Sequence, residues 1–256
     1  MQIDLEEKNI SSQVCPVCNG QSDFSFKKNK YYIFKCVTCN FLHVFPYPTK
    51  QEVIKYYSSG YRTAHANFYP KLKSRKRRAN LKALNFLQFI YHKKTIDIGC
   101  GGGIMADAFR RLGAKSYGID ISQNSIDFAR NNFPKCTFFC ETFDEAIKRK
   151  ISFDFIFTTE LMEHLTGPHE CMRFINAVSR PETIVYVATP DTDHKKVPKD
   201  ISSWSDICPP EHLQWFNKSN MEKLFNQYGF YLLKPYNKKS PALSMLFKKS
   251  RSLLNS

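Results

Sequence analysis

A glycine-rich loop at residues 99–103 constrains the fold of this chain more than any other feature. It stands in the segment TIDIGCGGGI (95–104), between a short apolar stretch and a helical one. Glycines at such a junction permit positive φ angles and let the backbone approach a ligand beside the positive end of a helix. A dinucleotide-binding G-x-G-x-x-G pattern would need glycine where Ile104 stands, so the loop is read instead as D-x-G-x-G-x-G, beginning at Asp97.

Apolar segments and helical segments alternate from residue 95 onward. Strands are predicted at 95–98, 116–119, 136–139, 153–158, 183–188 and 230–234, and helices at 104–112, 124–131, 170–178 and 219–228. Strands separated by helices of about ten residues are typical of a parallel sheet that is covered on both faces. We therefore expect an α/β fold with a doubly wound, mostly parallel, Rossmann-like sheet. A further helix should carry Leu81, Leu84, Leu87 and Tyr91 on one face.

Two acidic residues follow the first two predicted strands. Asp97 ends the first, where a carboxylate would repel pyrophosphate but suits a ligand that carries an ammonium and a sulfonium group. Asp120 ends the second, 21 residues beyond Gly99. That spacing is typical of a carboxylate that accepts hydrogen bonds from both hydroxyls of a ribose.

Four cysteines near the N-terminus have the spacing of a zinc site. Cys15 and Cys18 form one C-x-x-C pair, Cys36 and Cys39 form another, and 17 residues separate the pairs. Each C-x-x-C turn can aim two thiolates at one ion, and two turns complete a tetrahedron. Because four thiolates close the coordination shell, we expect a structural Zn²⁺. The domains expected on this basis are a zinc-ribbon module (1–48), a helical lid or linker (49–94), a ligand-binding α/β domain (95–237) and a basic tail (238–256).

The chain of 256 residues is strongly basic, with 38 Lys and Arg against 23 Asp and Glu, a net charge of +15. This balance favours polyanionic partners such as RNA, anionic lipid or phosphorylated substrates, or it serves solubility alone. The tail could form a basic amphipathic helix that rests on a membrane surface, or remain solvated. No apolar run is long enough for a transmembrane segment, the N-terminus lacks a signal-peptide pattern, and the paired cysteines suit a reducing compartment. We expect a soluble, cytoplasmic protein.

Five segments together resemble the class I S-adenosylmethionine-dependent methyltransferases, and in particular the group that contains ubiquinone-biosynthesis O-methyltransferases. They are DIGCGGG (97–103), GIDIS (118–122), FDFIFTTELMEHL (153–165), VYVATPD (185–191), and EHLQWF with NQYGF (211–216 and 226–230). The four-cysteine module followed by a proline turn resembles bacterial sugar and surface-glycan methyltransferases. The resemblance implies S-adenosylmethionine as cofactor and a small-molecule acceptor such as a nucleotide-linked sugar or a glycan precursor.

The same resemblance implies roles for residues around the loop. The three loop glycines would pass under the cofactor, Asp97 would steer its amino group, and Asp120 would hold the ribose. The other implied cofactor contacts are Ile121 against the adenine ring, two residues at the adenine edge, and one near the sulfonium. The complete implied set is Asp97, Gly99, Gly101, Gly103, Asp120, Ile121, Glu141, Thr142 and Thr159.

Candidate catalytic residues are His212, His164 and Glu163, since methyl transfer to a hydroxyl or a carbon acid needs a group that removes a proton. His164 could equally have a structural role. The segment after the fourth strand carries no N-P-P-[YF] motif of the kind found in enzymes that methylate planar amino groups, which favours oxygen or carbon as the acceptor. Two alternatives remain: an RNA methyltransferase that uses the basic surface and the zinc module, and a catalytically silent zinc-ribbon binding protein.

Overall fold

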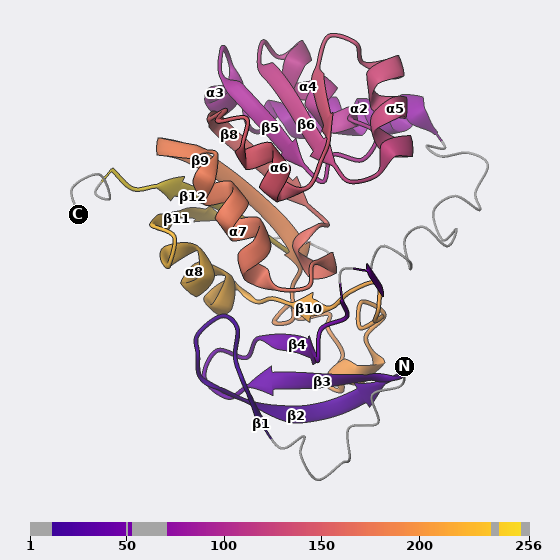
Figure 1. Ribbon diagram of the computed structural model, residues 1–256, viewed down its shortest axis with the longest axis vertical. Coiled ribbons are helices and arrows are strands. Elements are labelled where there is room, and N and C mark those ends of the chain that lie inside the picture. The colour runs from indigo at the N-terminus through magenta and orange to yellow at the C-terminus, as the bar shows by residue number, and fades with distance from the viewer. Residues whose placement is uncertain (1–11, 50, 53–70, 237–240, 252–256) are drawn as a thin grey trace.

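The computed structural model describes residues 12–49, 51–52, 71–236 and 241–251. Its larger part is a seven-stranded sheet in the order β11-β12-β9-β8-β5-β6-β7 (Figure 1). The strands of this sheet are β5 (Lys94–Ile98), β6 (Lys115–Asp120), β7 (Thr137–Cys140), β8 (Phe153–Thr159), β9 (Ser179–Pro190), β11 (Phe230–Pro235) and β12 (Ala242–Lys249). The first five pair in parallel, and β12 runs antiparallel between β9 and β11. The predicted doubly wound, mostly parallel sheet is confirmed.

Helices cover both faces of this sheet (Figure 1). On one face lie α2 (Leu72–Leu84), α3 (Leu87–Ile90), α4 (Ile104–Arg111) and α5 (Gln123–Asn132). On the other face lie α6 (Phe143–Ile147), α7 (Pro168–Ala177) and α8 (Lys218–Asn226). Two short 3₁₀ turns, η2 (Met162–His164) and η3 (Ile201–Ser203), lie in the connections that follow β8 and β9. Because successive connections switch face at β5 and β8, the ligand crevice of such a sheet belongs at the carboxyl ends of these strands.

The tail beyond residue 240 differs from the expectation of an amphipathic helix or a solvated terminus. Residues 242–249 form β12, while 238–240 and 252–256 lie outside the described residues. Leu243, Met245 and Phe247 join the apolar cluster on one face of the sheet, and Leu246 joins the cluster on the other. A strand that is covered on both faces lacks the alternation of apolar and polar residues by which an exposed strand is found in a sequence. The sequence-based reading of the tail was therefore wrong.

The helical segment before β5 also differs from expectation. It is divided into α2 and α3, and the four residues expected on one apolar face, Leu81, Leu84, Leu87 and Tyr91, are 41–58% exposed. Ala83, Phe86 and Ile90 pack into the core instead. The buried face therefore contains only one large aromatic residue and two smaller apolar ones, and the leucine pattern marked the wrong face.

The N-terminal residues form a second, antiparallel sheet in the order β1-β2-β3-β4-β10. Its strands are β1 (Ser12–Val14), β2 (Gln21–Lys28), β3 (Tyr31–Cys36), β4 (Leu42–Phe45) and β10 (Gln214–Trp215). The last of these comes from the far end of the chain and pairs with β4. Figure 1 shows this sheet below α7 and α8, on the side of the large sheet that those helices cover. The segment between β9 and α8 thus supplies the last strand of the N-terminal sheet.

Candidate functional site

The glycine loop leaves β5 and opens α4 at the carboxyl edge of the sheet. Gly99, Gly101 and Gly103 have φ angles of 70°, 49° and 73°, in the left-handed region that favours glycine. A Cβ atom on Gly103 would lie 2.5 Å from Cζ of Phe138, and one on Gly99 would lie 3.1 Å from a methyl carbon of Leu161. The glycines are therefore required by backbone conformation and by packing, and they keep the loop surface free of side chains.

Asp120 lies beside the loop at the end of β6. Its Oδ2 accepts a hydrogen bond from the backbone N–H of Gly101 at 2.9 Å, and its Oδ1 accepts one from Ser122, also at 2.9 Å. Each carboxylate oxygen keeps a second lone pair, so the group can still accept two hydroxyl donors. Ile121, the next residue, is 64% exposed, as a side chain that packs on a flat ring would need to be.

Asp97 lies at the end of β5 and is only 5% exposed. Burial raises its pKa to about 8, the nearby negative charge of Asp120 adds to this, and the positive charge of Lys82 opposes it. A buried carboxyl group of this kind is stabilised in its charged form when a cation binds next to it. The group is thus suited to the ammonium of an amino-acid moiety.

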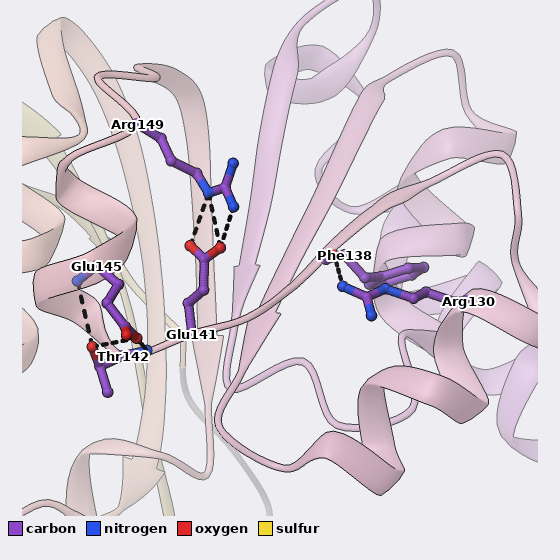
Figure 2. Close-up of polar contacts among 6 residues, drawn as sticks. All are labelled: Arg130, Phe138, Glu141, Thr142, Glu145 and Arg149. Atoms are coloured by element: carbon purple, nitrogen blue, oxygen red, sulfur yellow. Dashed lines mark hydrogen bonds and ion pairs between the residues drawn. The ribbon is translucent and has the colours of Figure 1, made fainter.

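Glu141 and Thr142 follow β7, and both have partners within the protein (Figure 2). Glu141 forms an ion pair with Arg149, which lowers the pKa of its carboxyl group. Thr142 is the N-cap of α6, in a capping box with Glu145. These contacts give both residues a structural role that is compatible with a nearby adenine edge. Thr159 ends β8 and is partly exposed at the same edge of the sheet.

The three predicted catalytic residues come together next to β8 and β9. Glu163 and His164 belong to η2, and His212 reaches them from the loop before β10. One ligand atom from each residue lies within 4.8 Å of the others, and the two imidazole rings are 4.8 Å apart between centroids in an edge-to-face arrangement. We call these three residues the Glu-His-His cluster. His212 is 48 positions beyond His164 in the sequence, and the fold brings the two segments together.

Backbone contacts fix the two segments that carry the cluster. Leu213 donates its N–H to the carbonyl of Glu163 at 2.7 Å, and the Gln214 side chain donates to the carbonyl of Met162 at 2.6 Å. Thr189 of β9 donates its hydroxyl to Oε2 of Glu163 at 2.9 Å. Glu163 is fully buried, and burial together with the nearby Glu160 raises its pKa to about 8.

Lys82 is a functional candidate that the sequence did not reveal. Its Nζ lies 4.8 Å from the ring centroid of Phe157 and 5.5 Å from that of Tyr186. Its charge lowers the pKa values of both Asp97 and Glu160, although burial raises each of them overall. Lys82 is therefore close enough to influence the charge of both Asp97 and Glu160. In the sequence it was hidden among the many basic residues of the same helix.

The four cysteines converge in the N-terminal sheet, with their sulfur atoms within 4.8 Å of one another. Cys15 and Cys39 have their Sγ atoms 3.7 Å apart, and Cys18 and Cys36 have theirs 3.4 Å apart. Bonds of about 2.3 Å to a tetrahedral Zn²⁺ would separate the sulfurs by a similar distance. The Sγ of Cys36 also accepts backbone N–H bonds from Thr38 and Cys39. The residues therefore fit a zinc ion.

Each cysteine pair lies in a turn of the same form. The residue after each second cysteine, Asn19 or Asn40, has a positive φ and donates its N–H to the carbonyl of the first cysteine of its pair. Asparagine tolerates this left-handed conformation. Two equivalent turns facing each other explain why the four sulfurs meet.

Comparisons with known proteins agree with this geometry. The sequence matches the family model described as a methyltransferase domain over residues 66–234. A ubiquinone biosynthesis O-methyltransferase from Bradyrhizobium sp. (strain ORS 278) is 28% identical over 173 residues, which cover 60% of this chain and 67% of that protein. The chain spans about two thirds or less of the length of such curated relatives, for example 60% of one from Neisseria meningitidis serogroup C.

Solved structures share the fold at low sequence identity. The magnesium protoporphyrin IX methyltransferase of Synechocystis, with bound S-adenosylhomocysteine, superposes with a TM-score of 0.59 at 12% identity and covers 78% of this chain and 100% of that one. The 1,6-didemethyltoxoflavin-N1-methyltransferase of Burkholderia thailandensis gives a TM-score of 0.58 at 14% identity and covers 89% and 99%.

None of the helices within the described ranges is long and apolar enough to cross a membrane. The fold, the geometry of the glycine loop and the family match all indicate the same class of enzyme. The chain therefore belongs to the methyltransferase-domain family and is an S-adenosylmethionine-dependent methyltransferase.

Proposed function

We propose that this enzyme transfers a methyl group from S-adenosylmethionine to an oxygen of a small molecule, or to an acidic carbon. The observation that carries the proposal is the placement of two groups of residues at one sheet edge. The glycine loop with Asp97 and Asp120 suits the cofactor, and the Glu-His-His cluster lies beside it after β8. An acceptor held at the cluster would face a donor held at the loop.

The cofactor contacts proposed for this site are those implied by the resemblance. Asp120 would hold the ribose, with the adenine ring against Ile121 and near Glu141 and Thr142. Asp97 would hold the amino group, over the backbone of Gly99, Gly101 and Gly103. Thr159 would lie near the sulfonium.

Methyl transfer is an in-line displacement at the sulfonium. The bond between the methyl carbon and sulfur breaks, the sulfur keeps the electron pair, and the acceptor oxygen bonds to carbon while its proton leaves. Most of the catalysis comes from alignment, and a positioned base contributes the proton removal. His212 and His164 both present imidazole groups at the cluster, with Glu163 behind them. We assign the proton removal to this cluster.

The acceptor that fits best is a small molecule with an acidic or phosphorylated part, such as a nucleotide-linked sugar or a glycan precursor. Support comes from Lys82 at the site, from the net charge of +15 and from the small-molecule activity named for the curated relatives. The N-terminal module would hold one structural Zn²⁺ on Cys15, Cys18, Cys36 and Cys39. Since the thiolates of these four cysteines persist in a reducing compartment, we expect the reaction to take place in the cytoplasm.

The proposal is tested by incubating the protein with methyl-tritiated S-adenosylmethionine and an extract of the source organism, with and without ribonuclease. We expect label in a small-molecule, lipid or glycan fraction, unchanged by ribonuclease. Asp120→Ala should bind S-adenosylmethionine at least about tenfold more weakly in calorimetry, since two charge-assisted hydrogen bonds are lost. Asp144→Ala, which removes an exposed carboxylate of α6, is the matched control.

Label that disappears with ribonuclease would make the protein an RNA methyltransferase and would refute the small-molecule assignment. Cofactor binding without transfer to any fraction would instead indicate a silent binding protein. If Asp144→Ala binds S-adenosylmethionine like the wild type, the weaker binding of Asp120→Ala is specific to Asp120 and not due to a general loss of negative charge.

A further inference from the structure

We propose that the Glu-His-His cluster binds a divalent transition-metal ion, which holds the acceptor oxygen. This inference deepens the proposed function and rests on it for the role of the ion, but the binding of the ion can be tested separately. The ion would be distinct from the zinc of the four cysteines, whose ligands lie in the other sheet.

The cluster has the dimensions of a metal site. One donor atom from each of Glu163, His164 and His212 lies within 4.8 Å of the other two. Bonds of about 2.0–2.2 Å to one ion place two ligands about 3 to 4.4 Å apart. The donor atoms are therefore close enough that rotations of their side chains could bring them to one ion.

Hydrogen bonds of the two imidazoles point to the same use. Nδ1 of His164 lies 2.6 Å from the carbonyl oxygen of Glu211, and Nδ1 of His212 lies 2.9 Å from that of Asp206. A carbonyl can only accept, so each ring donates from Nδ1, and the lone pair of the neutral ring is then on Nε2. Imidazoles that bind metals are commonly fixed in this way, with the second nitrogen donating to a backbone carbonyl.

Glu163 supplies the independent observation. Its side chain is 0% exposed, and Oε2 accepts the Thr189 hydroxyl. Its Oε1 meets the hydrogen-bond geometry with no partner among the residues that the structure describes, and the neighbouring side chain is another carboxyl group, that of Glu160. A buried carboxylate oxygen without a partner is costly, and a bound cation would satisfy it. Glu160, an exposed residue beside the cluster, adds negative charge that favours a cation.

The donor set defines the class of ion. Two imidazoles and a carboxylate suit Mn²⁺, Fe²⁺, Co²⁺ or Zn²⁺ better than Ca²⁺, which prefers oxygen ligands only. Three protein ligands leave coordination positions open for a hydroxyl or a carboxylate of the acceptor. An acceptor hydroxyl on such an ion has a lowered pKa and can lose its proton to solvent. With the ion bound, the cluster would therefore promote proton loss through the ion, and its imidazoles would not act as the base themselves.

The probe is Mn²⁺, titrated into the zinc-loaded protein and followed by the paramagnetic resonance signal of the free ion. We expect one bound Mn²⁺ per chain, with affinity at least about tenfold weaker in His212→Gln and in Glu163→Gln. His92→Gln, an exposed histidine beside the amino end of β5, should bind Mn²⁺ like the wild type. A second zinc per chain that is lost in His212→Gln would equally support the site.

Absence of Mn²⁺ binding in protein that holds a single zinc would overturn the inference, as would equal binding in His212→Gln and wild type. Because His212 is partly exposed, its variant tests the proposal even if Glu163→Gln fails to fold. Calorimetry with S-adenosylmethionine and methyl transfer are measured on the same samples. Transfer without ion binding would leave the proposed function in place, whereas ion binding without cofactor binding would refute the proposed function alone.

Discussion

At the scale of single residues, Asp97 has the most informative environment. It is nearly closed off from solvent, and burial raises its pKa to about 8 from an ordinary value of 3.8. A carboxyl group whose pKa is raised on folding costs stability as the pH rises from its ordinary value to the raised one. A bound ammonium would offset this loss of stability, because it would stabilise the ionised carboxylate of Asp97. Groups with perturbed pKa values are common at functional sites.

A pH dependence of cofactor binding follows. Below pH 8 the affinity for S-adenosylmethionine should rise by up to about tenfold per pH unit, because binding of the ammonium requires an ionised Asp97. Above about pH 8 the affinity should fall as the cofactor's own amino group loses its proton. Calorimetric titrations from pH 6 to pH 9 measure this profile. In Asp97→Asn the affinity should not rise with pH below pH 8. A rise that persists in this variant would contradict the role assigned to Asp97.

At the scale of elements, the junction of β5 and α4 depends on Gly103. The residue has a φ of 73°, and a Cβ atom there would lie 2.5 Å from Cζ and 2.6 Å from Cε1 of Phe138. Gly103→Ala should therefore lower the free energy of unfolding by about 2–4 kcal/mol, through left-handed strain and overpacking. Denaturant unfolding measures the change. Adding Phe138→Leu to Gly103→Ala should recover the part of the lost free energy of unfolding that is due to overpacking. If the effects of the two substitutions on the free energy of unfolding are simply additive, the contact between the two residues is unimportant.

The elements also show where sequence reasoning succeeds and fails. The strands and helices around the glycine loop were predictable because a buried parallel strand reads as a continuous apolar run and its loop carries a distinctive glycine spacing. The strand at 242–249 was missed because its partners come from β9 and β11, and no local pattern encodes them. The buried face of α2 and α3 was missed because Ala83 contributes to packing without adding to hydrophobic periodicity.

The candidate site likewise contains some residues that the sequence predicts and others that it does not. Asp97, Asp120 and the loop glycines stand next to strand ends that the sequence marks, so their proximity was predictable. Lys82 reaches the site from α2 through the packing of that helix on the sheet, which no spacing in the chain reveals. Gln214 and Thr189 support Glu163 through contacts that form only when β9 and β10 are in place.

At the scale of the whole molecule, the cysteine turns are bound to the helices of the larger domain. Asn220 of α8 donates to the carbonyl of Cys39, and Gln227 donates to that of Val17. His169 of α7 contacts the carbonyl of Pro16 at 2.6 Å. Near the active site, Val44 of β4 donates its N–H to the carbonyl of Leu213, which adjoins His212. The N-terminal module therefore fixes the segment that carries one catalytic candidate.

Removal of the zinc ion proposed for the four cysteines should consequently impair turnover more than cofactor binding. Cys36→Ser, or chelation, should lower stability by about 3 kcal/mol, which is about 6–12 °C in melting temperature for a chain of this size. Turnover should fall further than cofactor affinity, because His212 depends on the module through β10 whereas Asp97 and Asp120 lie at the ends of β5 and β6. Zinc content, calorimetry and methyl transfer, all measured below the melting transition, separate these effects. Cys136→Ser, at a half-buried cysteine outside the cluster, is the matched control. Full turnover in zinc-free protein, or an equal loss of cofactor affinity and turnover, would show that the module does not position the site.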